Sequence, residues 1–103
     1  MKMRKYGVPF LLFSISFLFT TAPSAAGVDR VKILAGNCTT CHGPKGEGYE
    51  LIPTIGGLDK EEILELMQGF KEGTETSTIM DRHAKGYTKQ EMEQLADYFS
   101  KLE

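Results

Sequence analysis

The chain has 103 residues, of which 12 are basic and 14 acidic, and its formal net charge is −2. This length limits the chain to one small domain and excludes a multidomain enzyme with its own nucleotide-binding fold. No basic block occurs beyond the first few residues, which argues against strong binding of polyanions such as nucleic acids.

The N-terminal segment has the order of a secretory signal peptide. Three basic residues lie within the first five, an apolar run covers residues 8–19, and a small-residue pattern at residues 24–26 is typical of a cleavage site. The apolar run is short for a membrane span, which needs about 20 residues, although an uncleaved anchor is the alternative. We therefore predict a signal peptide at residues 1–26 and an exported, periplasmic domain at residues 27–103, with no membrane span after cleavage.

Two helices are predicted in the first half of this domain. Residues 29–37 carry apolar side chains at i, i+3 and i+4, which indicates a short amphipathic helix. A second helix starts at Asp59, which has the capping-box spacing to Glu62, and it ends by Gly73. Between the two, residues 43–58 are rich in glycine and proline, which predicts an irregular loop.

The third predicted helix has the clearest start. Thr88 and Glu91 have the spacing of a capping box, and apolar residues then recur with the helical period as far as Leu102. Residues 71–87 separate it from the second helix as a loop of about 17 residues, and so long a loop in a small domain is usually functional. The pattern as a whole predicts an all-α domain with about three main helices.

The segment from Cys38 to His42 has the spacing Cys-x-x-Cys-His, the signature of covalent c-type haem attachment. Two thiols three residues apart can form thioethers with the two vinyl groups of one porphyrin, and the following imidazole then projects at the iron. A large apolar cofactor would also form the centre of a core that so small a domain can hardly build alone. We therefore predict one haem c bound through Cys38 and Cys41, with His42 as an iron ligand.

Three other interpretations of these residues compete with haem. A disulfide between Cys38 and Cys41 would close a very small loop and stabilise little. A thioredoxin-like redox pair requires a βαβ context, which the sequence does not show. A zinc site would combine both cysteines with His42 and His83, but adjacent residues seldom point at one ion, and no second paired-ligand motif exists.

The second axial position of a haem iron has four candidate ligands. Met67 and Met92 lie on apolar faces of predicted helices, so they are expected to pack in the core. Met80 and His83 lie in the long predicted loop, which can carry a side chain to the distal face. We prefer Met80, with His83 as the alternative. His–Met ligation would raise the reduction potential and leave no open iron position, which favours electron transfer over substrate chemistry.

The order of these features resembles a class I cytochrome c, and more closely the monohaem cytochrome subunit of flavocytochrome c sulfide dehydrogenase. The segments that carry the closer resemblance are 34–38, 51–57 and 77–88. The resemblance implies a small fold wrapped around one covalently bound haem, with His42 and Met80 as the axial iron ligands. It also implies that the backbone carbonyl of Pro53 accepts a hydrogen bond from the proximal histidine, although Pro53 could equally be an ordinary turn residue.

The resemblance further implies a function and a partner. In that family a flavoprotein subunit with FAD oxidises sulfide, and the cytochrome subunit takes the electrons and passes them to a downstream carrier. The chain would then be no enzyme on its own, and would have no catalytic residue. The alternative is a free periplasmic cytochrome c that shuttles electrons between respiratory or photosynthetic complexes, and a haem-free metal or thiol-redox protein is a third possibility.

Two further sets of residues have open roles. Arg82, Lys85 and Lys89 lie close to Met80 in the sequence and would form either a docking rim at the haem edge or a solvated loop. The tyrosines that could donate a hydrogen bond to a haem propionate are Tyr49, Tyr87 and Tyr98.

Overall fold

The structure, a computed structural model, describes residues 29–103, so the predicted signal peptide at residues 1–26 lies outside it. The described residues form four α-helices: α1 (Arg30–His42), α2 (Lys60–Glu72), α3 (Met80–Ala84) and α4 (Lys89–Ser100). The predicted all-α fold with three main helices is confirmed, and α3 is a short addition to it. Within residues 29–103, no helix is both long enough and apolar enough to cross a membrane.

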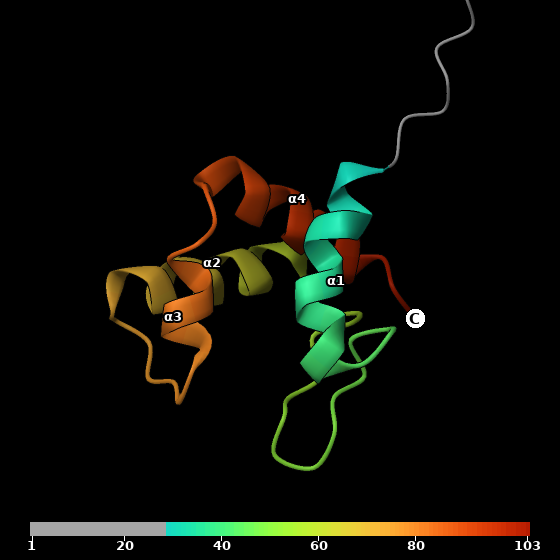
Figure 1. Ribbon diagram of the computed structural model, residues 1–103, viewed down its shortest axis with the longest axis horizontal. Helices are drawn as coiled ribbons and strands as arrows, with labels where there is room; N and C mark the ends of the chain where they lie inside the picture. The colour runs from blue at the N-terminus through green and yellow to red at the C-terminus, as the bar shows by residue number, and fades with distance from the viewer. Residues whose placement is uncertain (1–28) are drawn as a thin grey trace, which may run out of the picture.

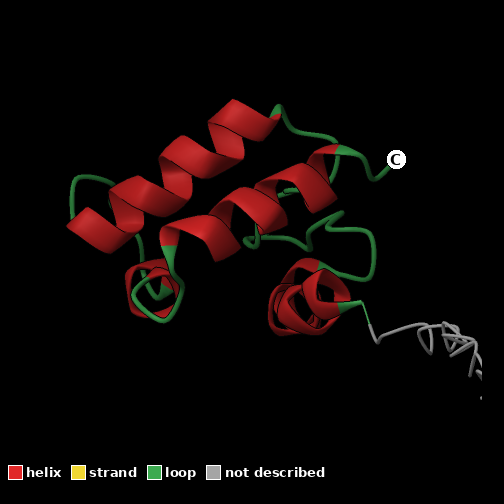
Figure 2. Cartoon of the chain, turned by 90° about the horizontal axis from the view of Figure 1, so that it is seen from above, coloured by secondary structure: helices red, strands yellow, loops and turns green. Residues whose placement is uncertain are grey.

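The helices form two layers that cross each other. The α2 and α4 helices lie side by side and run in opposite directions, as Figure 2 shows from above. The α1 helix packs against α4, and α3 packs against α2. In Figure 2 both α1 and α3 are seen nearly end-on below α4, one near each of its ends. The α1 and α3 helices therefore lie apart from each other on the same side of the α2–α4 pair, as Figure 1 also shows.

The core lies where these helices meet, and α4 contributes most of it. The apolar face of α4 is buried as its helical period predicted, with Leu95 and Phe99 as its largest fully buried side chains. Met67 of α2 and Met92 of α4 also belong to this core, which agrees with the packing role expected for them. The buried residues that make up the core are Ala35, Ile63, Met67, Ala84, Tyr87, Met92, Leu95, Ala96 and Phe99.

The α1 helix is longer than the sequence predicted. We expected it to end at about residue 37, but its backbone continues through the Cys-x-x-Cys-His segment to His42. The hydroxyl groups of Thr39 and Thr40 both donate to the carbonyl of Gly36, so these residues satisfy their polar groups within the helix. The helix ends at Gly43, whose φ of 92° is in a region that favours glycine.

The segment predicted as one long loop contains a short helix. The α2 helix ends at Gly73, which takes the left-handed conformation typical of a helix C-terminus. After a turn, Ser77 Oγ accepts a hydrogen bond from the Asp81 amide at 2.9 Å, which satisfies a free donor in the first turn of α3. At the start of α2, by contrast, the Asp59 side chain forms no capping hydrogen bond within the described residues, so the capping box predicted there is wrong.

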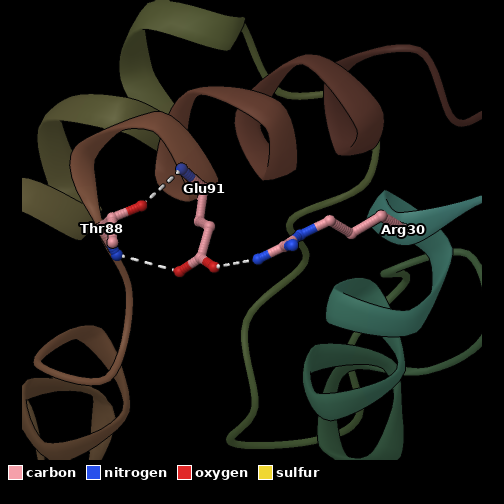
Figure 3. Close-up of polar contacts among 3 residues, drawn as sticks. All are labelled: Arg30, Thr88 and Glu91. Atoms are coloured by element: carbon pink, nitrogen blue, oxygen red, sulfur yellow. Dashed lines mark hydrogen bonds and ion pairs between the residues drawn. The ribbon is translucent and has the colours of Figure 1, made fainter.

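The start of α4 is tied to the start of α1 through Glu91. The predicted capping box is confirmed: the Glu91 amide donates to Thr88 Oγ1 at 3.1 Å, and the Thr88 amide donates to Glu91 Oε2 at 3.0 Å. Arg30 donates to the second carboxylate oxygen of Glu91 at 3.0 Å, as Figure 3 shows. One carboxylate therefore serves both as a helix cap and as a link between the first and the last helix.

Replacing Glu91 with glutamine is expected to make the stability of the protein less dependent on pH in acid. The Thr88 amide and then Arg30 hold the pKa of Glu91 below its ordinary value. A lowered folded-state pKa gives stability that is present above the ordinary glutamate pKa of about 4.3 and is lost as the pH falls through the folded-state value. Denaturant unfolding measured between about pH 6 and pH 3 checks this, with Glu65→Gln on the exposed face of α2 as control. Equal slopes in the Glu91→Gln variant and the wild type would contradict the expectation.

Candidate functional site

The last turn of α1 brings the three residues of the predicted haem motif onto one helix face. Cys38, Cys41 and His42 stand at i, i+3 and i+4, the spacing at which helical side chains are neighbours. Cys38 is half-buried, Cys41 is exposed, and both are free thiols. His42 is buried with 7% of its surface exposed. The helical backbone thus presents two thiols and an imidazole close together, which explains why this spacing suits covalent attachment of one cofactor.

The imidazole of His42 is fixed by a hydrogen bond to the backbone of Pro53. His42 Nδ1 lies 2.7 Å from the Pro53 carbonyl oxygen. Because a carbonyl oxygen only accepts, Nδ1 carries the proton, and Nε2 is left with its lone pair available for a metal. Among residues 29–103, no group forms a hydrogen bond with Nε2. This is the arrangement in which a second partner orients a metal-binding histidine.

The loop that carries Pro53 is held by close backbone contacts with the loop that follows α1. The carbonyl of Gly46 accepts hydrogen bonds from the amides of Ile55 and Gly56, at 2.7 and 2.9 Å. The Gly48 amide donates to the His42 carbonyl at 2.7 Å. Gly46 and Gly48 have φ values of 69° and 76°, so both positions need the conformational freedom of glycine. The sequence predicted only an irregular loop here, whereas these contacts position the backbone partner of His42.

Met80 is the first residue of α3, which packs against α2. Its side chain is half-buried and packs against the core. His83, the alternative ligand, lies one turn further along α3 and is exposed. Arg82, Lys85 and Lys89, the candidate docking rim, are also exposed, and the ion pairs within residues 29–103 include none of them. Their role stays a prediction.

A cavity of about 570 Å³ lies between α1 and the segment that contains α3. Cofactor pockets usually have volumes of about 300–1,000 Å³. Cys41 and His83 line this cavity, whereas Cys38, His42 and Met80 do not. Its remaining lining residues are Leu34, Asn37, Thr40, Arg82, Gly86, Tyr87 and Glu91.

The side chains of the Cys-x-x-Cys-His motif and of Met80 have the chemistry that a covalently bound haem requires, and of these residues only Cys41 lines the cavity. Two free thiols and an oriented imidazole come from α1, and a half-buried thioether comes from α3. Sulfur and imidazole ligands suit iron, and the described residues hold no cluster of His, Cys, Asp and Glu that would favour another metal. The zinc interpretation is therefore weakened by the structure as well as by the sequence.

Sequence reasoning missed the place of Tyr87 in the cavity beside α1. Tyr87 is buried and lines the cavity together with Leu34, Asn37 and Cys41 of α1. Burial raises the pKa of the Cys38 thiol. Burial likewise raises the pKa of the Tyr87 hydroxyl. The sequence marked Tyr87 only as one of three candidate propionate donors, and it gave no signal for Asn37.

The sequence of the chain is similar to those of several known proteins. Residues 28–103 match the family model described as Cytochrome c. The chain is 41% identical over 100 residues to the "Cytochrome subunit of sulfide dehydrogenase" of Chlorobaculum tepidum, and the match covers 91% of each chain. It is 34% identical over 76 residues to "Cytochrome c-552" of Acidithiobacillus ferridurans, which covers 74% of this chain and 32% of that protein. It is also 32% identical over 77 residues to "Cytochrome c-554(547)" of Halothiobacillus neapolitanus, over 64% of this chain and 85% of that one.

Proposed function

The chain belongs to the cytochrome c family, and on this premise we propose that it is the electron-accepting subunit of a sulfide-oxidising flavoprotein complex. Family membership makes haem c its cofactor and one-electron transfer its function. The observation that carries the finer proposal is the 41% identity, over 91% of the chain, to a cytochrome subunit of sulfide dehydrogenase. The flavoprotein nature of the partner rests on the resemblance stated from the sequence.

The roles of the site residues form part of this proposal. Cys38 and Cys41 hold the haem through thioether bonds, and His42 Nε2 and the Met80 sulfur ligate its iron. When bound, the haem supplies an iron that alternates between the ferrous and ferric states. The protein contributes an imidazole whose orientation is fixed by the 2.7 Å contact between His42 Nδ1 and the Pro53 carbonyl, and the Met80 thioether would supply the second iron ligand. With both ligands bound, the iron would have no open position for a substrate, which suits electron transfer.

We also propose that residues 1–26 are a signal peptide and that residues 27–103 act in the periplasm. The support is the basic, apolar and small-residue order of the N-terminus. Mass spectrometry of the protein from its source tests this proposal. A mature N-terminus at Gly27 is expected, and a chain that retains the first 26 residues would contradict it.

Replacing both Cys38 and Cys41 with serine is expected to abolish covalent haem attachment completely, because no thiol remains to form a thioether. Each single variant should keep one thioether. The measurement is haem staining after denaturing electrophoresis, with pyridine haemochrome spectra to count the thioethers, in a host competent for cytochrome c maturation. Thr39→Ser, between the two cysteines, is the control and should retain full staining. Covalent haem in the double variant would contradict the assignment, and a colourless wild type would contradict haem binding itself.

The partner is tested by isolating the protein from its natural source under mild conditions. The proposal predicts a stable complex with an FAD-containing protein that reduces this cytochrome when sulfide is added. A free monomer that carries no flavin, and whose haem sulfide reduces only slowly, would instead support the alternative of a periplasmic shuttle. The two outcomes differ in size-exclusion profile and in flavin content, so either one decides between the hypotheses.

A further inference from the structure

The segment between α2 and α4 carries Met80, and it is attached at both of its ends to the last turn of α2. At its start, the Thr74 amide donates to the Gly69 carbonyl at 2.9 Å. At its end, the Lys71 ammonium donates to the carbonyl of Tyr87. The α3 helix lies between these two attachments and packs against α2, as Figure 1 shows. The end of α2 therefore closes this segment from both sides.

The part of the segment that precedes α3 has few other attachments. Thr76, Thr78 and Ile79 are exposed, and among the described residues no backbone amide from Thr76 to Ile79 donates to another backbone group. Exposed stretches with few hydrogen bonds are those that open most easily in a folded protein. The attachments at the two ends, together with the fully buried Ala84 of α3, therefore decide how firmly Met80 is held.

The contact that Lys71 makes is transmitted to α3 through the backbone of Tyr87. The Tyr87 amide donates to the Ala84 carbonyl at 3.2 Å, while the Tyr87 carbonyl accepts from Lys71. Ala84 is the last residue of α3 and Met80 is the first. Only this short helix separates the attached backbone from the Met80 side chain, so the ammonium of Lys71 acts on the position of α3.

The charge of Lys71 is directed at this carbonyl. Its side chain is half-buried, and the ion pairs within residues 29–103 do not include it. A hydrogen bond from a charged donor is stronger than one from a neutral donor. A lysine in the last turn of a helix also interacts favourably with the helix dipole. A purely structural role at the end of α2 is therefore the alternative that an experiment has to exclude.

We propose that Lys71 is a positioning residue for the second axial ligand, because its ammonium holds the segment closed and keeps the Met80 sulfur at the haem iron. The proposal rests on Met80 as an iron ligand, which is proposed above. Opening of the segment withdraws the sulfur and exposes the iron to a small external ligand such as imidazole. Since imidazole binds only to the open state, its apparent affinity rises in proportion to the open fraction.

The test compares imidazole binding to the ferric holoprotein in the wild type and in Lys71→Leu, followed in the haem spectrum. Leucine and lysine have similar helix propensities, so the variant should fold. We expect imidazole to bind about three- to thirtyfold more tightly to Lys71→Leu, because the closed state has lost a hydrogen bond from a charged donor. Lys71→Arg keeps the charge and a donor, and it should restore most of the wild-type affinity. Lys32→Leu, on the exposed face of α1, loses the same charge and should bind imidazole as the wild type does.

Amide hydrogen exchange measures closure of the segment without reference to the iron. In Lys71→Leu the amides of Thr74 and Tyr87 should exchange faster, by a larger factor than the amides within α4. Wild-type imidazole affinity and wild-type exchange in this variant would overturn the proposal. A lower denaturant midpoint with unchanged imidazole affinity would also overturn it, since that result is expected if Lys71 only stabilises the end of α2.

Failure of the Met80 assignment gives a different result. The wild type would then lack the near-infrared sulfur-to-iron band, while the amides of Thr74 and Tyr87 would still exchange faster in Lys71→Leu. That combination would show that Lys71 closes the segment but does not position an iron ligand, and it would overturn the proposed role together with the assignment of Met80.

Discussion

Replacing Met80 with leucine should abolish the weak near-infrared sulfur-to-iron absorption band of the ferric protein and lower its reduction potential. The band requires a thioether bound to iron, and a thioether ligand raises the potential of a histidine-bound haem. Leucine is similar in volume to methionine, and such exchanges usually cost less than about 1.5 kcal/mol, so the fold should survive. The near-infrared spectrum and a redox titration of the variant measure both effects.

Met67→Leu and Met92→Leu are matched controls for this experiment. Both methionines are buried in the core, with 8% and 2% of their surface exposed, and both lie on helix faces that pack against other helices. Each variant should keep the band and a potential close to that of the wild type. The assignment of Met80 is wrong if the band survives in Met80→Leu and disappears in Met67→Leu. If His83→Ala instead alters the axial ligation, the bis-histidine alternative is correct.

The parts of the fold that the sequence predicted well are those with strong local signals. The α4 helix begins with a capping box and continues with a regular apolar period, and both features survive in the structure. The α3 helix has only five residues, too few to show a period, and a side-chain hydroxyl from Ser77 stabilises its start. The continuation of α1 through its cysteines was missed because threonine, cysteine and histidine carry no periodic helical signal.

The candidate site likewise has parts that local sequence signals predict and parts that they do not. The motif from Cys38 to His42 is contiguous, so its chemistry could be inferred directly from the spacing. The contact of His42 with Pro53 spans 11 residues and entered the prediction only through the family resemblance. The cavity that Tyr87 lines together with Asn37 and Cys41 was not predictable, because it is formed by segments about 50 positions apart in the sequence.

Replacing Gly56 with alanine should destabilise the protein more than any other single-methyl change in the loops around the site. A Cβ at Gly56 would overlap the Lys45 carbonyl oxygen, and one at Gly46 would lie 2.7 Å from the Gly56 amide nitrogen. Both obstacles are backbone atoms, which cannot rotate away as a flexible side chain can. The two loops would have to separate, and the hydrogen bonds from Ile55 and Gly56 to Gly46 would be strained or lost. We expect a loss of more than about 2 kcal/mol in the free energy of unfolding.

Gly36→Ala is the matched control, because it adds the same methyl group in the middle of α1. Among the described residues, nothing lies within 4 Å of a Cβ at that position. Alanine is favoured over glycine inside a helix by about 0.5–1 kcal/mol, so this variant should be slightly more stable than the wild type. Denaturant unfolding of the holoproteins measures both changes. Because the Gly46–Gly56 contact also holds the loop that carries Pro53, Gly56→Ala should disturb the His42 ligand field as it destabilises the fold. If Gly56→Ala unfolds at the same denaturant concentration as the wild type and has an unchanged haem spectrum, the two loops can separate at little cost. Other contacts would then hold Pro53 in place.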